Sequence, residues 1–145
     1  MKRIIYIILL GFIFSSEFKN LNGNDWKSWN FSNKIGYVNG FFDGFETYET
    51  LLDETIEMEI KRDPYWLHPL VITILNDNSR NYTDAISKFD SIELSKRLDA
   101  FYYEPDNYGI SIVNAMKILN LRELGSGKEA DTFLLECQKK YLKGK

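Results

Sequence analysis

The chain has very few residues of the types that most metal and thiol sites need. Cys137 is the only cysteine and His68 the only histidine among its 145 residues. A single cysteine cannot form a disulfide within one chain, and a single histidine excludes zinc sites built from several imidazoles. No glycine-rich phosphate-binding loop follows a strand pattern. We therefore expect no bound metal, no cofactor and no catalytic residue.

Both of these rare residues have an ordinary structural interpretation. Cys137 lies in a helical pattern of apolar residues, which favours a small buried hydrophobe, and the alternative is a disulfide-linked homodimer. His68 lies between Leu67 and Pro69 in an apolar segment. We expect it to be a core or boundary imidazole and not a catalytic base.

Positive charge is also scarce. The sequence has 18 basic and 21 acidic residues, a formal net charge of −3. Nucleic-acid phosphates select basic surfaces, so we expect no nucleic-acid partner. Four carboxylates recur at helical spacing on one predicted face: Glu46, Glu49, Asp53 and Glu57. We interpret them as a solvated acidic face, and an enzyme that acts on envelope material through them is an alternative.

The N-terminus carries the clearest targeting signal of the chain. Lys2 and Arg3 precede the apolar run Ile4–Phe14, which two serines follow. This pattern is typical of a secretory signal peptide, and the run is shorter than the ~20 residues that span a bilayer. We predict a signal peptide at residues 1–16 and a single domain at residues 17–145. The mature protein would be periplasmic or secreted, without membrane contact after cleavage.

Most of the remaining sequence has the apolar spacing of helices. Apolar residues at spacings of three and four predict a long amphipathic first helix that Ser32 caps and Asp63-Pro64 ends. Residues 65–75 suit a helix entered through Pro69 or a strand, and we favour the helix because no partner strand is evident. Residues 17–31 are expected to be irregular.

Turn and capping signals divide the second half of the chain. Residues 76–81 are expected to form a polar loop. Asp90, Ser111 and Ser126 each begin a helix, and Gly125 ends the helix before the last one. The sequence thus predicts an all-α fold, a compact bundle of five or six helices.

Three glycines interrupt the first predicted helix at every fourth position: Gly36, Gly40 and Gly44. Each costs about 1 kcal/mol relative to alanine inside a helix, so the stripe needs a compensating role. We expect close packing of another element against this bare backbone, and the alternative is a shallow groove for a partner.

Two patterns in the sequence resemble known proteins. The first is Trp26-x-x-Trp29 followed by Lys34-x-x-Tyr37-x-x-Gly40-Phe41-x-Asp43-Gly44. The second is Leu98-Asp99-x-Phe101-Tyr102-x-x-Pro105-x-Asn107 followed by Ile110-x-Ile112-x-x-Ala115. Together they resemble a group of small exported bacterial helical proteins, mostly uncharacterised. The Tyr-x-x-Gly-Phe-x-x-Gly core is also similar to the Rap/Tai family of periplasmic immunity proteins. That resemblance implies a small helical homodimer that neutralises peptidoglycan amidase toxins delivered by type VI secretion.

These observations predict a non-catalytic, exported module that binds a protein partner, with a homodimer as a further assembly. The predicted binding residues combine aromatic anchors with the glycine segment: Trp26, Trp29, Tyr37, Gly40, Phe41, Asp43, Gly44 and Tyr108. A type VI secretion immunity protein and an envelope-acting enzyme are the two alternatives.

Overall fold

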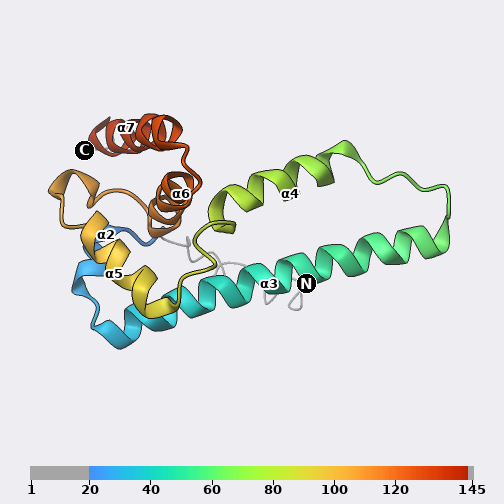
Figure 1. Cartoon of the computed structure of the whole chain (residues 1–145), viewed down its shortest axis with the longest axis horizontal. Coiled ribbons are helices and arrows are strands. Elements are labelled where there is room, and N and C mark those ends of the chain that lie inside the picture. The colour runs from blue at the N-terminus through green and yellow to red at the C-terminus, as the bar shows by residue number, and fades with distance from the viewer. Residues whose placement is uncertain (1–19, 144–145) are drawn as a thin grey trace, which may run out of the picture.

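The computed structural model describes residues 20–143, and in this part of the chain helices joined by short connections form the fold (Figure 1). Its elements are α2 Gly23–Ser28, α3 Phe31–Arg62, α4 Leu70–Thr83, α5 Ser91–Phe101, the 3-10 turn η1 Pro105–Asn107, α6 Ile112–Glu123 and α7 Gly127–Lys143. The predicted all-α bundle of five or six helices is confirmed. The predicted signal peptide, residues 1–16, lies outside the described residues. No helix between residues 20 and 143 is long and apolar enough to cross a membrane.

The helices divide into a head and an arm. We call residues 45–82 the arm; they comprise the second half of α3, the connecting segment and nearly all of α4. In Figure 1 the arm extends away from the head, which gathers α2, α5, α6, α7 and the start of α3. The last turns of α4 return to the head and pack against α6.

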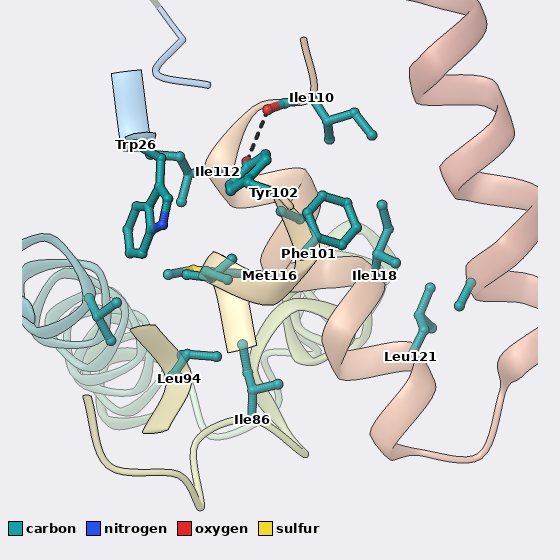
Figure 2. Packing of buried hydrophobic residues seen from close by; sticks show 14 residues of the cluster. Trp26, Ile86, Leu94, Phe101, Tyr102, Ile110, Ile112, Met116, Ile118 and Leu121 are labelled. Carbon is teal, nitrogen blue, oxygen red and sulfur yellow. Dashed lines mark hydrogen bonds between the residues drawn. The ribbon is translucent and has the colours of Figure 1, made fainter. Parts of the chain in front are cut away.

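The hydrophobic core lies in the head. Figure 2 shows Trp26, Leu94 and Met116 from three different helices pointing toward one another, and each of them is fully buried. Among the described residues, no buried hydrophobic side chain lies between residues 45 and 82. The apolar side chains that stabilise the fold by their burial therefore lie in the head. The arm is attached to the head through α3 and the end of α4.

The beginning of the chain is more ordered than the sequence indicated. The segment expected to be irregular contains α2, because Asn22 and Asp25 form a reciprocal capping box. The Asn22 side chain accepts from the Asn24 amide at 2.9 Å, and the Asn22 amide donates to the Asp25 carboxylate at 3.0 Å. The predicted cap of α3 is also wrong, since Asn30 and not Ser32 caps that helix. The predicted end of α3 before Asp63 is confirmed.

The ambiguous segment, residues 65–75, is helical from Leu70 onward, as we favoured. Pro69 precedes α4, but the polar loop expected at residues 76–81 is wrong, because α4 continues through it to Thr83. The Asn120 side chain on α6 holds the end of this helix: its amide nitrogen donates to the Arg80 carbonyl at 3.2 Å. A polar stretch can thus stay helical when a distant buried side chain satisfies its end.

The helix boundaries in the second half follow the sequence signals. Asp90 caps α5 by accepting from the Glu93 amide at 2.7 Å, and Ser111 caps α6. Gly125 ends α6 with a φ of 79°, a conformation that favours glycine. The three predicted helix starts and this glycine stop are therefore confirmed.

Candidate functional site

The two sequence patterns meet inside the head. The Trp26 indole nitrogen donates to the Asp99 carboxylate at 2.8 Å, and the Lys34 ammonium donates to the same oxygen at 2.6 Å. One carboxylate therefore joins α2, α3 and α5. Trp26 is fully buried, so the structure places this predicted binding residue in the core.

An aromatic cluster surrounds Trp26. The rings of Trp29 and Tyr37 lie 5.9 and 6.4 Å from it between centroids, and Tyr102 lies 6.5 Å away. Burial raises the pKa of the Tyr37 and Tyr102 hydroxyls above the usual value. The Tyr102 hydroxyl donates to the Ile110 carbonyl at 3.0 Å, as the dashed line in Figure 2 shows. Trp29 and Tyr37, both half-buried, are thus placed to stabilise the head.

Tyr108 connects the turn after η1 to α2. The Lys27 ammonium donates to the Tyr108 hydroxyl and lies 4.1 Å from the centroid of its ring. The Asn24 side chain donates to the Tyr108 carbonyl at 3.4 Å. Tyr108 is half-buried, and both of these partners belong to α2.

The glycine stripe does not pack against another element. Gly36, Gly40 and Gly44 are exposed, and a Cβ added at any of them would meet nothing within 4 Å. The expectation of close packing is therefore wrong. The head packs against the other side of α3, where Val38 is fully buried. Asp43, another predicted binding residue, is also exposed.

Phe41 is the predicted residue that borders a groove. It lies at the head end of an open apolar groove of about 320 Å³ between α3 and α4, with Val113 of α6 also in its lining. The other lining residues come from the arm: Phe45, Tyr48, Leu75, Asn78, Ser79 and Tyr82. Of the eight residues predicted for binding, only Phe41 lines this groove.

Large apolar side chains are exposed along the arm on both sides of its tip. Tyr65 and Leu67 at the tip are 91% and 88% exposed. Ten of the sixteen large hydrophobic residues that are exposed in the described part belong to the arm: Tyr48, Leu51, Met58, Ile60, Tyr65, Leu67, Leu70, Val71, Ile74 and Leu75. Isolated exposed hydrophobic residues are normal, but a concentration of them in one region is typical of an interaction surface.

Several of these side chains share one side of the arm. Tyr48 on α3 and Leu75 on α4 line the same groove, so the two helices turn these flanks to the same side. On α4, Val71 lies one turn from Leu75. On α3, Leu51 lies one turn from Tyr48 and borders a neighbouring hollow together with acidic residues of the same helix. We call this surface the arm face and define it by Tyr48, Leu51, Met58, Val71, Leu75 and Tyr82.

Sequence reasoning missed the arm face for an identifiable reason. The apolar line through Leu52 and Ile56 predicted one amphipathic face, and these two side chains are indeed half-buried. Leu51 and Met58 belong to a second line on the same helix, and they are 58% and 61% exposed. A helix with two lines of apolar residues is expected to pack against neighbours on two sides. Within this chain, the head and α4 cover only the line of Leu52 and Ile56.

The residues considered for metal binding or catalysis do not lie together in one site. Within residues 20–143, no three side chains of His, Cys, Asp or Glu are grouped so that they could hold a metal ion. His68 is exposed at the arm tip, so its expected core or boundary position is wrong, and its Nε2 forms a hydrogen bond of 3.0 Å with the Thr73 hydroxyl. Cys137 is half-buried against the core, and burial raises its pKa, which favours the thiol form.

No protein-family model, curated protein or solved structure matches the chain. The resemblances drawn from the two sequence patterns therefore stay predictions.

Proposed function

We propose that this chain is an exported, non-catalytic domain that acts by binding another protein through the arm face. The observation that carries the proposal is the contrast in burial: the head buries its apolar residues, whereas the arm exposes large ones on both of its helices. Burying apolar surface contributes about 25 cal/mol per Å², so a partner that covers the arm face gains substantial binding energy.

The chemistry of the arm face supports protein binding in particular. It combines tyrosine, methionine and branched aliphatic side chains, and protein interfaces are enriched in aromatic residues and methionine. The groove between α3 and α4 adds a concave element into which side chains of a partner can insert.

Immunity is the more specific form of this proposal. The motif Tyr37-x-x-Gly40-Phe41-x-x-Gly44 supports it through its similarity to the Rap/Tai family. An immunity protein of this kind acts by binding a toxin, so it needs a binding surface and no catalytic group. The envelope-acting enzyme gains no comparable support. Of the four carboxylates considered for it, three are exposed and Glu49 is half-buried.

Export is the second part of the proposal. Lys2, Arg3 and the apolar run behind them support it. Mass spectrometry of the protein isolated from its native host should find an N-terminus near Glu17. A chain that retains Met1 and stays in the cytoplasm would contradict export.

The binding role is tested by capture from an envelope extract, followed by titration of each captured protein in purified form. We expect the Leu51→Gln/Leu75→Gln variant to lose capture, because it places two amides in the arm face. Leu135→Gln is the matched control: Leu135 is 53% exposed on α7 and Leu75 is 52% exposed on the arm. Equal capture by all three proteins would contradict binding through the arm face.

A further inference from the structure

We propose that the partner protein presents an amphipathic helix, which lies in the groove between α3 and α4 and places a carboxylate beside Lys117. This rests on the proposed function in one respect, because it takes the arm face to be a protein-binding surface. It goes further by naming the secondary structure of the partner's segment and the charge that the segment carries.

The groove has the length of one face of a short helix. Its walls run from Phe41 to Tyr48 on α3 and from Leu75 to Tyr82 on α4. Each wall covers about two turns of helix, or about 10 Å at a rise of 1.5 Å per residue. Side chains at positions i, i+4 and i+7 of another helix span the same length, and helices that dock in apolar grooves use this spacing. One face of a partner helix can therefore fill the groove with three side chains.

The lining of the groove selects apolar side chains. Four of its eight residues are aromatic, Leu75 and Val113 are aliphatic, and none is charged. Of the two polar members, Ser79 already donates its hydroxyl proton to the Asn76 carbonyl at 2.7 Å. Tyr48 and Leu75 are 40% and 52% exposed, so the groove is accessible at the end that lies in the arm. Apolar side chains of a partner would gain by burial there.

A cation without an acidic partner lies at the head end of the groove. Lys117 follows Val113 by one turn of α6, and its ammonium is 5.0 Å from the centroid of the Tyr82 ring. The same ammonium is 4.6 Å from the centroid of the Phe133 ring on α7. Lys117 is half-buried, and within residues 20–143 it forms no ion pair. The two rings hold the ammonium in place, and a carboxylate of the partner would complement its charge.

The acidic residues of α3 do not border this groove. Glu46 and Glu49 line a different hollow together with Asp84, and Asp43 and Glu54 line another. A partner helix therefore meets a positive charge at the head end of the groove, although the whole chain carries a formal net charge of −3. A lysine or arginine of the partner at that position would set like charges beside one another, so the site discriminates against it.

Selection from a library of helical peptides tests the chemistry of the occupant. The library uses an alanine-rich host of about 18 residues, long enough to be helical, with the positions of one face randomised. The purified protein is the bait. We expect enrichment of apolar residues at i, i+4 and i+7, with aspartate or glutamate one turn beyond one end of this set. The Tyr48→Gln/Leu75→Gln variant should lose these peptides. Peptides without this pattern, or with a basic residue in place of the acidic one, would overturn the proposal, as would the absence of any enriched peptide.

A charge cycle between peptide and protein tests the role of Lys117. Replacing the acidic residue of an enriched peptide by its amide should weaken binding to the unaltered protein about fivefold. The same replacement should change binding to Lys117→Met less than about twofold, because the opposite charge is then gone. Fluorescence anisotropy of labelled peptides measures each dissociation constant. An equal loss with both proteins would show that the carboxylate binds elsewhere and would overturn its pairing with Lys117.

Two controls accompany this cycle. Lys117→Met keeps an unbranched apolar side chain beside the rings of Tyr82 and Phe133, and circular dichroism checks that its helices remain. Lys96→Met, an exposed change on α5, should retain the fivefold difference between the two peptides.

Two outcomes separate this proposal from the proposed function. If Leu51→Gln/Leu75→Gln loses capture of an envelope protein while the library shows no acidic preference, the chemistry of the occupant is overturned and binding through the arm face stands. An enriched peptide at saturating concentration should displace the captured protein. A captured protein that stays bound would overturn the assignment of the groove to a helix of that protein.

Discussion

The head and the arm use apolar residues in opposite ways. In the head, Trp26 and Met116 are fully buried, whereas in the arm Met58 is 61% and Tyr65 91% exposed. The two regions are continuous through α3, so one helix serves both. The difference shows that burial in this fold is decided by what packs beside a segment and not by how apolar the segment is.

Polar groups differ between the two regions as well. In the head, the buried Asn120 side chain accepts from the Ala85 and Ile86 amides at 2.6 and 3.1 Å. In the arm, the ion pairs Lys61–Glu57 and Arg62–Glu59 on α3 join neighbouring turns of the same helix. Long-range polar contacts fix the head in one arrangement, whereas neighbouring-turn pairs stabilise a helix without fixing its position.

Replacing a tryptophan in each region should give the largest difference between them. Trp26→Ala should lower the free energy of unfolding by about 3–5 kcal/mol, since it empties a core position and removes a hydrogen bond to Asp99. Trp66→Ala in the half-buried arm tip should cost less than about 1 kcal/mol. Urea denaturation followed by circular dichroism measures both. Comparable losses would show that the arm contributes as much to stability as the head.

Alanine at two glycines should give changes of opposite sign. Gly23→Ala should destabilise by about 1–3 kcal/mol, because its Cβ would lie 2.5 Å from the Tyr102 ring and 2.8 Å from the Tyr108 backbone. Gly40→Ala should stabilise by up to about 1 kcal/mol, because the new Cβ meets only solvent and alanine favours the helix. Thermal unfolding of both variants measures the sign. A lower melting temperature for Gly40→Ala would restore the packing interpretation of the stripe.

The smallest expected effect is a dependence of stability on alkaline pH. Burial raises the pKa of Tyr102 in the folded chain above its usual value of 10.0. Above pH ~10 the unfolded chain releases this proton and the folded chain retains it, so stability is complete below that pH and falls as pH rises. The slope should approach about 1 kcal/mol per pH unit for this group.

Two phenylalanine variants isolate that slope. Tyr102→Phe should lower the free energy of unfolding at every pH, because the hydrogen bond to Ile110 is missing. Between pH 9 and pH 11, however, the free energy of unfolding of this variant should decline less steeply. Tyr65→Phe, at an exposed arm position, should leave the decline unchanged. Urea denaturation at several pH values measures it. An identical decline in both variants would show that Tyr102 is not the titrating group.

The local signals of the helices were readable because they depend on near neighbours. Asp90, Ser111 and Gly125 each act within one turn of the backbone, and each marks a helix end in the structure. The helix after Pro69 and the end of α3 follow the same logic. The sequence alone determined the all-α class, most helix ends, and the scarcity of groups for metal or thiol chemistry.

The candidate site depended on contacts between residues distant in sequence. The sequence predicted Trp26 as a binding anchor, but the structure buries it beside Asp99, which also binds Lys34. The sequence predicted Gly40 as a packing position, but α3 turns its other side to the head. Periodicity gives the angle between side chains on one helix but not the direction of the neighbouring helix. Only the tertiary structure decided which apolar line of α3 is covered and which remains exposed on the arm.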